Sequence, residues 1–177
     1  MREGSPYRLL SVVEDRFLPD KTFWNRDTLE ELFLALGDLP LHPLAVHFAV
    51  ALFPVALAFL IVVTISKKLR TKYLNHALVA PALTIPFIFV AQQSGEALSE
   101  VMYEPEPHSE YGEMLMPLAL SVLAIGVLLW FSIRKAWPKI VSQVLGFGLV
   151  SLSIGAIVMT VVVGHSGAAA TWTGILP

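Results

Sequence analysis

Three long segments of the chain carry no charged side chain, and they limit what this sequence can fold into. No Lys, Arg, Asp or Glu occurs from Pro43 to Ser66, from Met114 to Ile133 or from Ile140 to Pro177. An uncharged apolar helix of roughly 20 residues spans the hydrocarbon core of a bilayer, which is about 30 Å thick. Soluble domains are typically about 25% charged, whereas this chain is 15% charged and 55% hydrophobic. The chain is therefore expected to be an integral membrane protein.

The hydrophobic pattern predicts an all-α fold, an integral membrane four-helix bundle. Pro81 and Pro86 are expected to make the second helix irregular, because proline lacks a backbone N–H. Gly148, Ser151 and Gly155 form a stripe of small residues on the fourth helix, a pattern suited to close contact with another helix. The expected spans are about 43–66, 73–93, 109–133 and 140–164.

Two regions are expected, a polar amino-terminal arm at 1–41 and the helix bundle at 42–177. Within the arm, apolar residues recur with helical spacing and predict an amphipathic helix that ends at Gly37; they are Leu29, Leu32, Phe33 and Leu36. Such a helix could lie in the membrane interface or pack against loops of its own protein. No cleavable signal peptide is visible in the arm.

The loops predict how the bundle is oriented in the membrane. The loops after the first and third spans hold only basic residues, namely Lys67, Lys68, Arg70, Lys72, Arg134, Lys135 and Lys139. The loop after the second span holds only acidic ones, namely Glu96, Glu100, Glu104, Glu106, Glu110 and Glu113. Because basic loops stay in the cytoplasm, both termini are expected on the non-cytoplasmic side. The arm, with its five Lys and Arg residues, must then be translocated.

Several kinds of chemistry are excluded or disfavoured by the composition. The absence of cysteine excludes disulfides, thiolate metal ligands and iron–sulfur clusters. No basic patch suggests nucleic acid as a partner. The sequence GHSG at 164–167 ends a helix and has no preceding strand, so it does not resemble the nucleophile elbow of hydrolases. No independent catalytic activity is expected.

Four of the five histidines are expected at one face of the bilayer. His42 and His47 begin the first span, His108 precedes the third and His165 closes the fourth, whereas His76 lies at the opposite end. His47 is about 7.5 Å deeper than His42 and about 140° around the helix. We therefore expect His42 at the mouth of the bundle and His47 inside it. An ionisable residue inside a membrane span is by default a functional candidate.

Three interpretations of the histidines stay open. In the first, His47 and either His108 or His165 are axial ligands of a b-type haem, since cofactor sites in bundles lie between facing helices; His42 is a further candidate ligand. In the second, His47, His108 and His165 bind a metal ion such as zinc or copper, together with Glu96. In the third, the imidazoles are structural and satisfy buried polar groups.

Three functions follow from these alternatives. The first is electron transfer by a haem protein in the lipid bilayer, alone or as a subunit beside other membrane redox subunits. The second is a non-catalytic interaction or assembly subunit, indicated by the amphipathic arm and the small-residue stripe. The third is a small transporter, which is indicated only by Pro81, Pro86, Gln92 and Gln93.

The first span carries a motif that resembles a known family. HPLAVHFAVAL at His42–Leu52 resembles H-P-x-x-V-H-F-P-[IV]-A-L, the opening signature of small bacterial membrane proteins called domain of unknown function 2231. Ala49 replaces the usual proline of that signature. The resemblance implies a four-helix fold in the bacterial inner membrane, and it implies no activity.

Three further positions resemble the same family, so that the resemblance covers about residues 41–172. SGEA at Ser94–Ala97 resembles a glycine-containing turn after the second helix, and His108 resembles a histidine before the third. GHSGAAATW at Gly164–Trp172 resembles the ending G-x-x-G-G-x-x-V-Y, with Ala168 in place of its second consecutive glycine.

Overall fold

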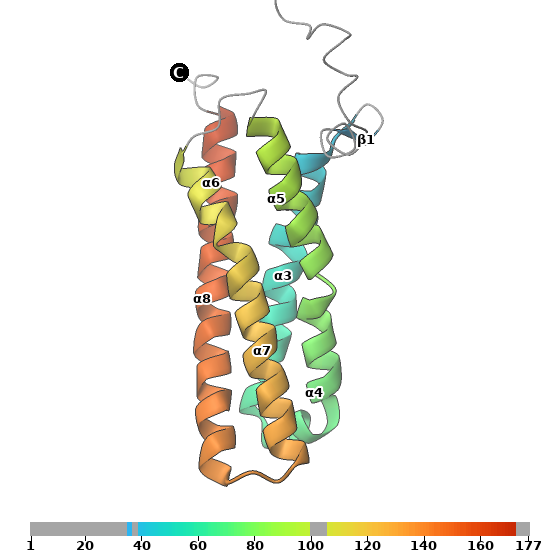
Figure 1. The fold of residues 1–177 in the computed structure, drawn as a ribbon, viewed down its shortest axis with the longest axis vertical. Helices are drawn as coiled ribbons and strands as arrows, with labels where there is room; N and C mark the ends of the chain where they lie inside the picture. Colours follow the sequence, from blue (N-terminus) through green and yellow to red (C-terminus); the bar gives the residue numbers. More distant parts are fainter. Residues whose placement is uncertain (1–34, 37–38, 100–105, 173–177) are drawn as a thin grey trace, which may run out of the picture.

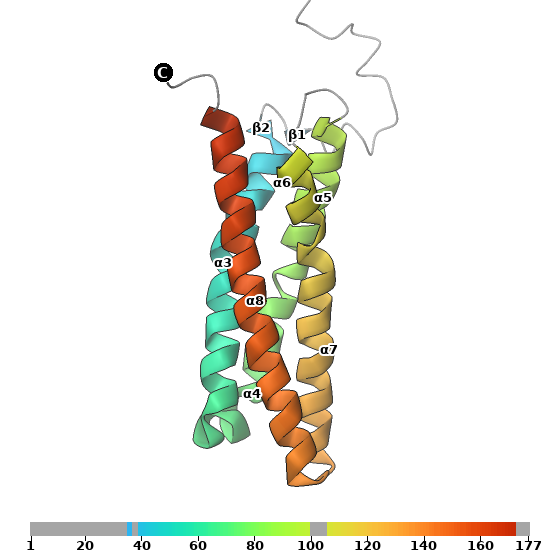
Figure 2. The same cartoon turned by 90° about the vertical axis from the view of Figure 1, so that its left-hand side faces the viewer.

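The computed structural model describes residues 35–36, 39–99 and 106–172, and it confirms the all-α membrane bundle. Figure 1 shows long helices running side by side along one axis. Figure 2, turned by 90°, shows α8 lying between α3 and α7. The elements are β1 (Ala35–Leu36), β2 (Leu39–Pro40), α3 (Leu41–Ile65), α4 (Lys67–Ala82), α5 (Ile85–Ser99), α6 (Glu106–Glu113), α7 (Leu115–Arg134) and α8 (Lys139–Trp172).

Four segments of the described chain are long and apolar enough to cross a membrane, as predicted. They are Leu41–Ile65, Lys67–Ser99, His108–Arg134 and Lys139–Ala169. The last helix, α8, continues to Trp172, so His165 lies within it and does not close it. The alanines that follow Gly167 favour this extension, because alanine is the best helix former.

The bundle has two ends of opposite character. The end where α3 begins and α8 finishes carries His42 and His108, and we call it the histidine end (Figure 1). The end with the α3–α4 and α7–α8 turns carries the basic residues at 67–72 and 134–139, and we call it the basic end. Within the described residues every Asp and Glu lies toward the histidine end, at positions 96, 106, 110 and 113.

The second span is irregular, as predicted, and proline is the cause. The α4 helix ends at Ala82 and α5 begins at Ile85. Pro86 has no N–H for the carbonyl of Ala82, four residues earlier, and its ring would clash with that carbonyl. The hydroxyl of Thr84 donates to the carbonyl of Pro81 at 2.6 Å, which satisfies one of the groups at the break.

The third span is broken in the same way, which the sequence analysis did not anticipate. The α6 helix ends at Glu113 and α7 begins at Leu115. Glu113 stands four residues before Pro117, so its carbonyl loses its helical partner. The break turns the start of this span into a separate short helix, α6, which carries His108.

The core is built around one face of α3, which packs against α4, α5 and α8. Phe53, Leu57, Leu60 and Val63 of α3 are at most 1% exposed. They pack with buried residues of the other helices, namely Ile88, Val122, Leu129 and Leu149. The outer surface is also apolar, and Phe147 is 78% exposed. An apolar exterior is unfavourable in water and suits lipid.

The small-residue stripe on α8 does not form a contact inside the bundle. A Cβ atom added at Gly148 or Gly155 would meet no atom within 4 Å, and Ser151 is exposed. Gly126 on α7 lies at a tighter contact, because an added Cβ would be 2.3 Å from the Leu78 side chain on α4. Close approach thus occurs between α7 and α4 at Gly126, and on α8 it occurs at Gly164 and Gly167 and not along the predicted stripe.

The predicted amphipathic helix of the arm lies almost entirely outside the described residues. Its described end, Ala35–Leu36, is strand β1 and pairs antiparallel with Leu39–Pro40, so this part of the prediction is wrong. The paired segment leads directly into α3 at Leu41.

The burial of α3 side chains predicts that a leucine-to-alanine substitution destabilises the protein more at a buried position than at an exposed one. Leu57→Ala, at a fully buried site, should lower the free energy of unfolding by about 2 kcal/mol or more, because it leaves a cavity. Leu52→Ala, at a 44% exposed site, should cost far less, because lipid fills the space. Reversible unfolding in detergent micelles measures both. Equal losses would contradict the packing described.

Candidate functional site

The structure brings His42 and His108 together and leaves His47 and His165 apart from them. His42 lies on α3 and His108 on α6, and both are half-buried. Their ring centres are 6.3 Å apart and their planes are nearly perpendicular, at 82°. His47 and His165 are exposed. His76 is exposed on α4, where its ring lies against Tyr73.

The rotation of α3 reverses the expected roles of its two histidines. Ala45 and Ala49 are buried and follow His42 at helical spacings of three and seven residues, so His42 lies on the inward face. His47 is about 140° around the helix from His42 and therefore faces outward. Its Nδ1 contacts the carbonyl of Pro43 in its own helix. The histidine expected at the mouth thus points inward, and the one expected inside does not.

A similar rotation explains His165. Val163 is buried, Gly164 faces Val50 of α3, and Ser166 and Gly167 face His108. These four positions form the inward face of the last turns of α8. His165 lies between them in sequence and projects to the other side, since neighbouring residues are about 100° apart on a helix.

Hydrogen bonds define the tautomer of His42. Its Nδ1 lies 2.8 Å from the carbonyl oxygen of Ala91 and 3.4 Å from the hydroxyl of Ser94, both on α5. A carbonyl oxygen can only accept, so Nδ1 carries the proton. In the neutral ring Nε2 is then the nitrogen with the lone pair.

The same argument applies to His108. Its Nδ1 lies 3.0 Å from the hydroxyl oxygen of Ser166 on α8. That hydroxyl donates its own proton to the carbonyl of Val163, also at 3.0 Å. When that proton lies on the Val163 side, the oxygen of Ser166 accepts from Nδ1–H of His108, and Nε2 is then the basic nitrogen of both rings.

The two histidines are held by the same kind of contacts. Each lies near the start of one span and contacts a Ser-Gly dipeptide near the end of the following span, Ser94–Gly95 for His42 and Ser166–Gly167 for His108. A Cβ added at Gly95 would be 2.9 Å from Cε1 of His42, and one added at Gly167 would be 2.8 Å from Cε1 of His108. A side chain at either position would therefore displace the neighbouring ring.

The sequence pattern marked both dipeptides only as positions of the family resemblance, and their pairing with the two histidines was not predicted. The chain contains Ser-Gly only at 94–95 and 166–167. Each follows a histidine by more than fifty residues, with separations of 52 and 58 between the bonded partners. A histidine followed by Ser-Gly more than fifty residues later occurs twice, and this repeat in the sequence indicates two related helical hairpins.

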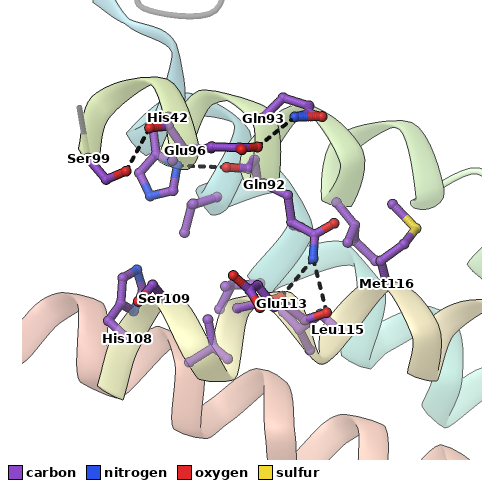
Figure 3. Close-up of a pocket in the computed structure, with 18 residues that line it drawn as sticks. His42, Gln92, Gln93, Glu96, Ser99, His108, Ser109, Glu113, Leu115 and Met116 are labelled. Atoms are coloured by element: carbon purple, nitrogen blue, oxygen red, sulfur yellow. Dashed lines mark hydrogen bonds between the residues drawn. The ribbon is translucent and has the colours of Figure 1, made fainter. Parts of the chain in front are cut away.

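A cavity of about 470 Å³ adjoins the histidine pair. Figure 3 shows the two rings pointing toward one another across the gap between α5 and α6. The polar part of the lining is Gln92, Gln93, Glu96, Ser99, Ser109 and Glu113. The apolar part is Val46, Ala49, Val50, Ile88, Ala91, Leu115, Met116 and Val163.

Gln92 holds α6 in place across this cavity. Its Nε2 donates to the carbonyl of Gly112 at 2.9 Å and to that of Glu113 at 3.3 Å (Figure 3). These are carbonyls at the end of α6, where Pro117 removes the helical donor for Glu113. One side chain of α5 thus satisfies the carbonyl groups at the break between α6 and α7. This break separates α6, which carries His108, from the rest of the span.

No group of three or more metal-binding side chains surrounds a common point among the residues that the structure describes. His47, His108 and His165, the expected zinc or copper ligands, are not brought together. What the geometry offers is a facing pair of imidazoles from two helices, with a cavity beside it.

Comparison with known proteins gives a family and nothing more specific. The sequence model of DUF2231, described as a predicted membrane protein, matches residues 38–176. Neither the comparison with curated proteins nor that with solved structures found a match.

Removing the amide of Gln92 should loosen α6. In Gln92→Leu the carbonyls of Gly112 and Glu113 lose their donor, so amide hydrogen exchange in α6 should rise about tenfold. Gln93→Leu is the matched control, because the Gln93 amide bonds only the exposed carboxylate of Glu96. Exchange followed by mass spectrometry separates the two variants. An unchanged rate in Gln92→Leu would contradict the clamp.

Proposed function

The chain belongs to the DUF2231 family of predicted membrane proteins, and on this premise we propose that it binds a b-type haem between His42 and His108 and transfers electrons. The observation that carries the proposal is the facing pair of imidazoles, which come from different helices and have ring centres 6.3 Å apart. The pair replaces the expected combinations of His47 with His108 or His165.

The separation of the rings suits two axial ligands of one iron. A bond between a metal and an imidazole nitrogen is about 2.0–2.1 Å long, which puts the centres of two opposed imidazoles roughly 6.4 Å apart. The observed distance is 6.3 Å. The 82° between the ring planes is compatible with this ligation, since each ring can rotate about its own bond to the metal.

The hydrogen bonds at Nδ1 also support ligation. A histidine that binds metal usually donates its other N–H to an oxygen, which selects the tautomer and raises the basicity of the ligating nitrogen. His42 donates to the carbonyl of Ala91 and His108 to the hydroxyl of Ser166. Both rings therefore have the protonation that binding through Nε2 requires.

The surroundings favour haem over a bare metal ion. Ligand cavities measure about 300–1,000 Å³, and the volume beside the rings, about 470 Å³, lies within that range. Haem needs only two protein ligands, whereas a structural zinc ion needs four. The described residues supply a facing pair and no larger cluster.

Two axial histidines would determine the kind of chemistry. An iron with both axial positions taken by protein has no open site for oxygen or a substrate, so its natural reaction is the gain and loss of one electron. His42 and His108 would hold the iron, Ala91 and Ser166 would orient the rings, and the apolar lining would exclude water. The proposed role is therefore electron carrier, alone or as a subunit of a membrane redox complex.

A visible spectrum tests the proposal. The purified full-length protein, expressed with adequate haem, should show a Soret band and low-spin ferrous bands. His42→Ala and His108→Ala should each abolish the low-spin spectrum, because either change removes an axial ligand. Ser166→Ala should weaken haem retention about tenfold, since it removes the partner of Nδ1.

His47→Ala and His165→Ala are the matched controls, because both residues are exposed. They should leave the spectrum unchanged. A protein without a Soret band, or a spectrum lost only in the control variants, would refute the assignment.

The proposed orientation places the histidine end on the non-cytoplasmic side of the bacterial inner membrane, with both termini there. It is supported by the seven Lys and Arg residues at the basic end, a distribution that marks the cytoplasmic side.

An assembly subunit remains the second candidate function. It is favoured by the small-residue stripe on α8, because a Cβ added at Gly148 or Gly155 would meet no atom within 4 Å.

Single cysteines test the orientation directly, because the natural sequence contains none. A membrane-impermeant maleimide should label Glu110→Cys in intact spheroplasts, since Glu110 is exposed at the histidine end. Lys135→Cys, exposed at the basic end, should react only after the membrane is opened. The reverse pattern would show that the basic end faces outward.

A further inference from the structure

An arginine at the basic end is half-buried without an anionic partner. Arg70 lies in the first turns of α4, and within the described residues its guanidinium has no hydrogen bond or ion pair. No Asp or Glu occurs in the described chain at this end, from 64 to 82 or from 132 to 146. A partly desolvated charge is costly unless an anion accompanies it.

The guanidinium lies where three helices meet. A Cβ added at Gly146 of α8 would be 3.8 Å from Nη1 of Arg70 and 3.8 Å from Cγ2 of Thr64, near the end of α3. Gly146 is buried, so its missing side chain leaves Arg70 close to the backbone of α8. The arginine is therefore seated between the α3–α4 turn and α8, and it does not simply extend into solvent.

A second polar group beside Arg70 is also unsatisfied. Thr64 is 4% exposed, and its Oγ1 has no hydrogen-bond partner. Threonine in a helix commonly bonds a carbonyl one turn earlier, and this one does not. Two polar groups at this corner of the bundle, the Thr64 hydroxyl and the Arg70 guanidinium, thus lack a partner within the described residues.

The start of α4 adds positive potential at the same place. Ser66 caps the helix by accepting from the amide of Leu69 at 3.4 Å. Lys67 and Lys68 occupy the first turn, where the positive end of the helix dipole already repels cations. A sequence that puts basic residues there gains stability from a bound anion.

We propose that Arg70, held between Thr64 and Gly146 at the start of α4, binds the phosphate of an anionic membrane lipid. The planar guanidinium matches phosphate oxygens in pairs. The neighbouring outward side chains, Val62 at 55% and Ile65 at 68% exposure, are apolar and would contact the acyl chains. Basic side chains at the end of a membrane span are suited to anionic headgroups. The site lies at the opposite end from the histidine pair and is independent of haem.

Native mass spectrometry of the full-length protein tests the site. The protein is released from micelles that contain equal amounts of phosphatidylglycerol and phosphatidylcholine with the same acyl chains. The unmodified protein should retain phosphatidylglycerol preferentially. Arg70→Gln should reduce that preference about fivefold, and Lys68→Gln, which removes an exposed cation from the same turn, should reduce it much less.

Gly146→Val is the second variant, because it keeps every charge. The added side chain should displace Arg70 and lower the lipid preference as Arg70→Gln does, while the protein still elutes as a single species. Equal losses in Arg70→Gln and Lys68→Gln would overturn the site in favour of diffuse attraction. No preference in the unmodified protein would also overturn it. Displacement of phosphatidylglycerol by millimolar inorganic phosphate would overturn the lipid as the occupant.

Discussion

Inside a bilayer every backbone N–H and C=O group must find its partner within the protein. This constraint makes the chain helical. Where proline removes a backbone N–H, the helix ends and the freed carbonyl needs another partner. Pro86 and Pro117 each end a helix four residues earlier, at Ala82 and Glu113. The groups freed at the second break are satisfied by Gln92 from a neighbouring helix. The result is α6, a short separate helix that presents His108 to the bundle.

The histidine pair depends on the same requirement. Each imidazole contacts, through Nδ1, an oxygen on the span that follows its own, Ala91 for His42 and Ser166 for His108. Glycine beside each ring allows the close approach. The same hydrogen bonds thus satisfy polar atoms of the protein and hold the two rings close to each other. A cavity of about 470 Å³ lies beside the rings that these contacts hold.

Much of the fold could be predicted because hydrophobic length is a local property of the chain. The hydrophobic pattern predicted the four spans, and Pro86 predicted the break in the second. The break before Pro117 was missed, although the same rule applies to it. Both histidines that meet were predicted as candidate ligands, but His47 was expected to pair with His108 or His165. The prediction failed at the rotation of α3 about its axis, which turns His42 inward and His47 outward.

The sequence by itself determined that the chain crosses the membrane, how many times, and at which end most histidines gather, because these follow from the length and order of apolar segments. Only the tertiary structure decided that His42 faces His108 while His47 and His165 face outward. The rotation of a helix depends on the faces that its neighbours cover, and α3 is covered by α4, α5 and α8, of which α8 is distant in sequence. No local pattern contains that information, since apolar residues surround α3 on the lipid side as well as the core side.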